Sequence, residues 1–222
     1  MKSTPYFVRL AACITLLLAP HPRLLAQSLV LDNYNSGNIV VSSTTSDGII
    51  QYVPGVMGGI RIIDFSMQNP SSASSLTIGS GVLTFNATTP GDWFVATDGY
   101  NPSSIYDLSH YNAFEVTIVS APAGPGWLGM GVGDLNGSAS GAVAPLPTSG
   151  TIIVPFSWWD WAGVDFQHVM DVEVDINAEV PGTYVLDDFQ AVEVPEPTLL
   201  SLAGLGAAAW LLFRRLPRLS AD

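Results

Sequence analysis

The sequence predicts an all-β sandwich, and three observations support this fold class. Between residues 27 and 193 no long amphipathic helix pattern occurs. Short runs rich in β-branched and aromatic residues instead alternate with turns of Gly, Pro, Asn, Asp and Ser, as is typical of sandwiches and barrels. The segment 171–176, Asp-Val-Glu-Val-Asp-Ile, alternates acidic and apolar residues, so one side of this strand should face the core and the other water.

The expected strands follow one another at short intervals. They lie at 38–43, 49–53, 59–67, 75–78, 82–86, 93–97, 113–120, 128–134, 151–156, 169–177 and 183–194. The segment 76–85 reads as a β-hairpin, because its glycines are available for the positive φ of a tight turn. Residues 122–126 and 137–150 are rich in Gly, Ala, Ser and Pro and are predicted as loops. A chain of 222 residues has room for one such domain plus terminal signals.

Residues 1–26 have the pattern of a secretory signal peptide. Lys2 and Arg9 precede a short apolar core, and Ala26 supplies the small residue before the expected cleavage. The apolar core is shorter than the roughly 20 residues that span a bilayer. Cys13 is the only cysteine and would leave with this peptide, so we expect neither a disulfide nor a thiolate metal site in the mature domain.

Charge is distributed unevenly along the chain. Arg61 is the only Lys or Arg between Gln27 and Pro197, against eighteen Asp and Glu, which gives this part a formal charge of −17. Phosphate backbones require clustered Lys and Arg, so nucleic acid is excluded as a partner. Cations, neutral glycans and basic surfaces remain candidate partners. The plainer explanation of the negative charge is that it keeps an exported protein soluble.

Residues 194–222 combine three elements in order. Val-Pro-Glu-Pro comes first, an apolar stretch follows at 198–213, and a basic tail contains Arg214, Arg215 and Arg218. As a helix, the stretch covers about 24 Å at about 1.5 Å per residue. The hydrocarbon core is about 30 Å thick, so the helix would anchor with local thinning. The arginines predict that this end stays in the cytoplasm and that the domain lies outside.

Pro195, Glu196 and Pro197, the apolar helix and the pair Arg214 and Arg215 together resemble the PEP-CTERM sorting signal of Gram-negative bacteria. The resemblance implies an exosortase-like enzyme that recognises the Pro-Glu-Pro segment and removes the helix. The domain would first be tethered to the inner membrane through the helix and then reach the cell surface or the extracellular matrix. The resemblance also implies association with extracellular polysaccharide. The alternative is a plain tail anchor behind a proline-rich stalk.

The order of elements between residues 27 and 193 resembles galactose-binding-like jelly rolls, the fold of many carbohydrate-binding modules. The similar segments are 31–34, 58–61, 107–116, 153–156 and 184–189.

This second resemblance implies a jelly-roll β-sandwich over 27–193. Many such modules hold a structural Ca²⁺ between their first and last strands, which makes Asp32, Asp187 and Asp188 the candidate ligands. Calcium prefers carboxylate and carbonyl oxygens. The alternative is that the Asp pair simply ends a strand in solvent.

Aromatic side chains are the candidates for glycan binding, because sugar C–H faces stack on rings. Trp158, Trp159 and Trp161 form the densest cluster, and alternation along a strand would bury at least one of the first two. Large rings more often fill the core, and we expect this for Trp93. The candidates for glycan stacking are Trp161, Trp127 and Trp159.

No catalytic pattern stands out. Ser109 and His110 are adjacent and would face opposite sides of a strand, and no nucleophile elbow, zinc-protease helix or phosphate loop occurs. A carboxylate pair can hydrolyse glycosides, but among eighteen acids some pair will be suitably spaced by chance. We therefore expect a non-catalytic surface or matrix protein associated with exopolysaccharide, with direct glycan binding to be tested. The alternatives are a purely structural protein-contact domain and, third, a glycoside-active enzyme.

Overall fold

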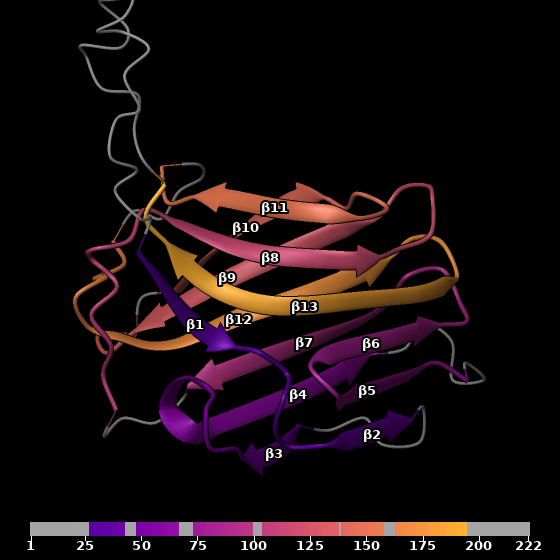
Figure 1. Ribbon diagram of the computed structural model, residues 1–222, viewed down its shortest axis with the longest axis horizontal. Coiled ribbons are helices and arrows are strands. Elements are labelled where there is room, and N and C mark those ends of the chain that lie inside the picture. Colours follow the sequence, from indigo (N-terminus) through magenta and orange to yellow (C-terminus); the bar gives the residue numbers. More distant parts are fainter. Residues whose placement is uncertain are drawn as a thin grey trace, which may run out of the picture. The chain divides into compact units, whose positions relative to one another are not determined.

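The computed structural model describes residues 27–42, 48–66, 73–99, 104–137, 139–157 and 163–194 (Figure 1). These residues form a sandwich of two antiparallel β-sheets, which confirms the predicted all-β class. The helical content of the described part is a single 3-10 turn at Met57–Gly59. Within the same ranges no helix is long and apolar enough to cross a membrane. The predicted signal peptide, the Pro-Glu-Pro motif and the apolar segment 198–213 lie outside the described residues.

The strands alternate between the two sheets along much of the chain. One sheet has the order β11-β8-β13-β6-β5-β2, with β1 also pairing with β13, and the other has the order β10-β9-β12-β7-β4-β3. From β6 onward this is the strand order of a jelly roll, four strands to each sheet. The bounds are β1 Ser28–Asp32, β2 Ile39–Ser42, β3 Ile49–Tyr52, β4 Ile60–Ser66, β5 Ser75–Gly79, β6 Val82–Ala87, β7 Asp92–Gly99, β8 Ala113–Ser120, β9 Trp127–Asp134, β10 Ala139–Pro145, β11 Gly150–Pro155, β12 Val169–Ala178 and β13 Gly182–Val192.

Two strands of the structure have no counterpart among the expected ones. β1 pairs with β13 near the start of the domain. β10 lies within the segment 137–150, so the prediction of a loop there is wrong for its central part. The Gly and Ala residues of β10 have little intrinsic β-propensity. The segment is a strand because it pairs with β9 along its whole length, from Ala139 opposite Gly133 to Pro145 opposite Trp127.

The predicted alternation of β12 and the predicted hairpin are both confirmed. Val172, Val174 and Ile176 are completely buried between the sheets, and the acidic residues between them face the other way. In the β5–β6 hairpin, Ser80 and Gly81 both have positive φ, 57° and 84°, as a type I′ turn requires. Ser80 thus takes a position that the sequence pattern suggested for a glycine.

Aromatic rings join the two sheets at the centre of the core. Phe85 of β6 lies edge-on to Phe65 of β4 and to Phe94 of β7, with ring centroids 5.7 and 5.1 Å apart. Tyr184 of β13 packs on the same ring at 6.0 Å. These rings cover the inner side of the six-stranded sheet. The other side of that sheet faces outward.

Candidate functional site

Polar and aromatic side chains gather on the outer face of the six-stranded sheet, where β7, β12 and β9 lie side by side. Asp171, Glu173 and Asp175 of β12 point outward because Val172, Val174 and Ile176 point inward. Opposite them on β9 stand three glycines. We call this surface the acidic face, formed by Trp93, Val95 and Thr97 of β7, Trp127, Gly129, Gly131 and Gly133 of β9, and Asp171, Glu173, Asp175 and Asn177 of β12.

The glycines of β9 make room for the carboxylates of β12. A Cβ built at Gly131 would lie 2.8 Å from Oε2 of Glu173, and one at Gly133 would lie 2.6 Å from Oδ1 of Asp171. At Gly129 the overlap with the Asp175 carboxylate would be closer still. The three acidic side chains therefore lie across β9, in space that any larger residue would fill. The glycine at every second position of β9 leaves this space open to the carboxylates.

The pKa values of all three carboxylates are raised, mainly by burial. Burial, followed by the nearby charge of Glu173, raises the pKa of Asp175 to about 6. Burial and then Asp171 raise the pKa of Glu173, and burial raises that of Asp171. At neutral pH this part of the face is a row of partly dehydrated hydrogen-bond acceptors.

We expect the domain to be more stable near pH 5 than near pH 7.5. Because the pKa of Asp175 rises from 3.8 in the unfolded chain to about 6 in the fold, the folded state binds the proton more tightly. This contribution is complete below about pH 4 and is lost as the pH rises through 6. The free energy of unfolding should fall by up to about 3 kcal/mol over this range.

The melting temperature as a function of pH measures this effect, and Asp175→Asn is the matched control. The variant should have a flatter profile between about pH 4 and 7. The exposed Asp107 and Asp165 act in the opposite direction, because hydrogen bonds from Ser109 and His168 lower their pKa values. Identical profiles for the variant and the parent protein would contradict the assignment to Asp175.

An aromatic row crosses the acidic face at one end. Trp127 is in register with Asn177, which is in register with Trp93 on the next strand. Neighbouring strands are about 4.8 Å apart, so the two tryptophan backbones are about 10 Å apart on one face. The Trp127 side chain is 45% exposed and Trp93 is partly buried. The buried Oδ1 of Asn177 accepts no hydrogen bond from the described residues, a need that water or a ligand hydroxyl would meet.

The structure corrects one aromatic assignment and leaves others open. Trp93 was expected in the core, but it points to the outer face because its neighbour Phe94 points inward. Trp127 lies on the same face. Trp158, Trp159 and Trp161 fall outside the described residues, so the choice of Trp159 and Trp161 stays a prediction.

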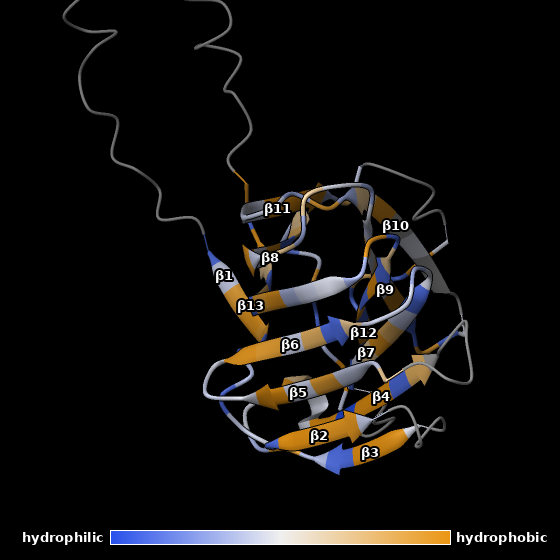
Figure 2. Ribbon diagram, turned by 90° about the vertical axis from the view of Figure 1, so that its right-hand side faces the viewer, coloured by the Kyte–Doolittle hydropathy of each residue, from blue (hydrophilic) through white to orange (hydrophobic). Residues whose placement is uncertain are grey.

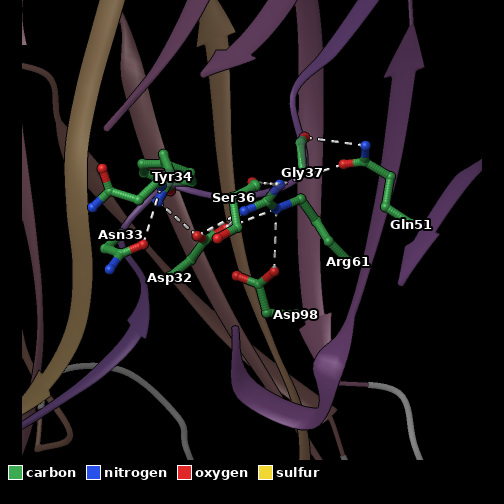
Figure 3. A network of polar contacts seen from close by, with 9 residues as sticks. Asp32, Asn33, Tyr34, Ser36, Gly37, Gln51, Arg61 and Asp98 are labelled. Atoms are coloured by element: carbon green, nitrogen blue, oxygen red, sulfur yellow. Dashed lines mark hydrogen bonds and ion pairs between the residues drawn. The ribbon is translucent and has the colours of Figure 1, made fainter. Parts of the chain in front are cut away.

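Arg61, the only Lys or Arg of residues 27–194, lies in the interior within a second polar cluster (Figure 3). Arg61 is fully buried and donates two hydrogen bonds to Asp32, from Nε to Oδ2 at 2.8 Å and from Nη2 to Oδ1 at 2.7 Å. Its Nη1 donates to the Ser36 carbonyl at 3.1 Å and to Oε1 of Gln51 at 3.3 Å. The guanidinium lies 5.8 Å from the centroid of the Tyr34 ring.

A second buried carboxylate shares this arginine without a hydrogen bond. Asp98 Oδ1 lies 3.7 Å from Arg61 Nε, and neither Asp98 oxygen has a hydrogen-bond partner among the described residues. Burial, and then the charge of Asp32, raises the pKa of Asp98 well above its ordinary value. The cluster ties β1, β3, β4 and β7 together. Because it takes up Arg61, no Lys or Arg of residues 27–194 is exposed.

The candidate calcium ligands do not form a shared site. Both Asp32 oxygens accept hydrogen bonds from Arg61, and Oδ1 also accepts one from the Tyr34 amide. Asp187 and Asp188 are partly buried beside it, at a bulge where Asp188 has a φ of 45°. Among the described residues no three His, Cys, Asp or Glu side chains are grouped to hold a metal. Asp32 as placed does not fit a calcium ligand, and binding by the remaining pair stays a prediction.

Sequence patterns alone did not identify most residues of the acidic face, because these residues come together only when the strands pair. Asp171, Glu173 and Asp175 were read only as the solvent side of a strand, and the glycines opposite them were assigned no role. Trp93 was considered for glycan stacking but expected in the core, and Asn177 was assigned no role. A Gly-x-Gly-x-Gly pattern in a predicted strand was the one available signal, since glycine within a strand often marks a place where another group approaches the backbone closely.

No protein-family model matches the chain, and no curated protein sequence matches it. Among solved structures, the chain is similar to the family 11 carbohydrate-binding module of a cellulosomal cellulase of Clostridium thermocellum, with 12% identity, a TM-score of 0.41, and coverage of 77% of this chain and 96% of that one. A family 29 carbohydrate-binding module has 9% identity, a TM-score of 0.41 and coverage of 84% and 99%. The agarase AgWH50C has 11% identity, a TM-score of 0.44 and coverage of 76% and 25%. At such identities and TM-scores, a function has to be argued from this chain's own residues.

Proposed function

We propose that the acidic face binds an uncharged polysaccharide chain. The observation that supports this most directly is the row Trp127, Asn177 and Trp93 beside the carboxylates of β12. Two tryptophans whose backbones are about 10 Å apart on one face offer stacking surfaces to the apolar faces of sugars. The carboxylates next to them are hydrogen-bond acceptors, and sugar hydroxyls are donors.

The charge of the domain selects the class of polysaccharide. No Lys or Arg side chain of residues 27–194 is exposed, while Asp171, Glu173 and Asp175 stand on the face itself. A uronate, sulfate or phosphate group on the ligand would meet only like charge there. A neutral chain rich in hydroxyl groups has no such cost.

We also propose that the protein works outside the cell. The signal-peptide pattern of residues 1–26 and the PEP-CTERM-like pattern of residues 194–222 support this proposal. The chain would be held at the inner membrane by its C-terminal helix and then processed by an exosortase-like enzyme. After release it would be a non-catalytic component of the exopolysaccharide matrix.

Retention on insoluble polysaccharides tests the binding proposal. The full chain, purified in mild detergent, would be passed over neutral and anionic polysaccharides, including the polymer made by the producing cells. We expect retention on a neutral polymer that a soluble sugar of the same type competes away, and none on anionic polymers. Lack of retention on all neutral polymers would favour the alternative, a structural domain that only makes protein contacts.

A second candidate function, glycoside hydrolysis, is favoured by one observation. Asp175 has a pKa of about 6, as a general acid needs, and Glu173 stands two residues away on the same face. The two backbones are therefore about 7 Å apart. The same retention experiment distinguishes the two functions, because hydrolysis would release soluble reducing sugar from the bound polymer. Release that Glu173→Gln abolishes would replace binding by catalysis as the function of this face.

A further inference from the structure

The chain leaves the domain at one end of the sandwich, where the residues before Pro195 are held in place. The Asn112 side chain binds both hydrogen-bonding groups of the Val194 backbone: Nδ2 donates to the carbonyl at 2.8 Å, and Oδ1 accepts from the amide at 2.7 Å. The Glu193 amide donates to the Gln27 carbonyl at 2.9 Å. β1 starts here as well, because it pairs with the last residues of β13 (Figures 1 and 2). We call this the exit end of the domain.

The aromatic row lies at the opposite end, which we call the far end. β13 runs from Gly182 at the far end to Val192 at the exit end, and its neighbours β6 and β8 are antiparallel to it. The short connections from β6 to β7, from β8 to β9 and from β12 to β13 therefore lie at the far end (Figure 1). Trp93 is the second residue of β7, Trp127 the first of β9, and Asn177 the last but one of β12. The length of β13, about 30 Å at about 3.3 Å per residue, thus separates the row from the exit end.

The link between the exit end and the expected membrane anchor is short. Three residues, Pro195, Glu196 and Pro197, separate Val194 from the apolar stretch at 198–213. An extended chain covers at most about 3.6 Å per residue, so the link spans about 14 Å at most. With the apolar stretch in a bilayer, the exit end stays close to the membrane surface. A binding surface at that end would be covered.

We propose that the domain binds its polysaccharide while it is still anchored, with the aromatic row directed away from the membrane. This inference rests on the proposed function and adds that binding does not wait for processing. Because the row is at the far end, a polysaccharide chain reaches it without passing between the domain and the bilayer. Anchored copies therefore hold polymer at the membrane, and processing releases protein and polymer together.

Capture of vesicles tests this inference. The full chain would be reconstituted into fluorescent vesicles of phosphatidylethanolamine and phosphatidylglycerol. The vesicles would be applied to the insoluble neutral polysaccharide that retains the chain in detergent. We expect the polymer to capture them, a soluble sugar of the same type to release them, and Trp127→Ala to prevent capture. Leu135→Ala, at a side chain 47% exposed, is the matched control and should be captured like the parent protein.

The outcomes separate this inference from the proposed function. Retention in detergent without capture of vesicles that carry the protein would overturn the inference and leave the binding function intact. Retention in neither form would refute the binding function, and the inference with it. Protein that does not float with the vesicles in a density gradient would show that residues 198–213 are no anchor, which overturns the inference alone.

Energy transfer to an acceptor on the lipid head groups measures the orientation. In a Cys13→Ser background, Glu193→Cys carries a fluorophore at the exit end, and Glu179→Cys carries one in the connection between β12 and β13. Both side chains are exposed, so labelling should leave the melting temperature unchanged. Transfer should be several times stronger from residue 193, since the two positions are about 30 Å apart along β13. Equal transfer from both positions would show that the domain lies flat on the membrane and would overturn the proposal.

Discussion

Replacing Trp127 by Ala is expected to weaken retention on a neutral polysaccharide by about thirtyfold. Truncating an aromatic side chain at the centre of a binding surface commonly costs about 2 kcal/mol or more, and about 1.4 kcal/mol corresponds to a factor of ten. Trp127 is 45% exposed at the start of β9, so its loss removes a ligand contact rather than part of the core. The double variant with Trp93→Ala should lose retention altogether.

Two further variants separate stacking from general apolar contact. Trp127→Phe keeps a flat ring and should recover much of the retention. Leu135→Ala removes an apolar side chain of similar exposure, 47%, just beyond β9 and should have no effect. Melting temperatures confirm that each variant folds. If Trp127→Ala binds as well as the parent protein, the aromatic row is not the binding surface.

The second large effect is expected in the buried cluster, on stability rather than on binding. Arg61→Met should lower the free energy of unfolding by about 3–5 kcal/mol, because Asp32 would lose its partner while staying buried. Asp98→Asn should leave stability unchanged or raise it at neutral pH. Burial already raises the pKa of Asp98 well above its ordinary value, and an amide resembles the protonated carboxyl.

Urea denaturation at neutral pH measures both variants. The double variant Arg61→Met with Asp32→Asn tests the cause, since removing the stranded charge should recover part of the lost stability. A large destabilisation by Asp98→Asn would show that Asp98 is ionised and held by Arg61 in the fold. The loss in the free energy of unfolding of Arg61→Met would then arise from both carboxylates, Asp32 and Asp98.

Several features of this fold could be predicted from local patterns. The alternation in β12 determines which side chains enter the core, because the period of a strand is two residues. The hairpin of β5 and β6 follows from a short turn between two apolar runs. The excess of acidic residues argues against nucleic acid as a partner without any knowledge of the fold. In each case the information lies within a few neighbouring residues or in composition alone.

The composition of the acidic face depended on pairing between distant segments. Trp127, Asn177 and Trp93 meet because β9, β12 and β7 are neighbours, although they are far apart in the chain. The run Trp-Phe-Val in β7 is apolar throughout, so it does not indicate which ring points outward. β10 is a strand only because β9 offers it a partner.

Local sequence patterns also could not predict where the only arginine of residues 27–194 would lie. Arginine side chains usually lie on the surface. Here Asp32, the Ser36 carbonyl and Gln51 accept hydrogen bonds from Arg61 in the interior. These partners come from segments whose proximity is created by the packing of the two sheets. Local sequence thus decides the direction of each side chain within a strand, whereas tertiary pairing decides which side chains become neighbours, and binding depends on those neighbours.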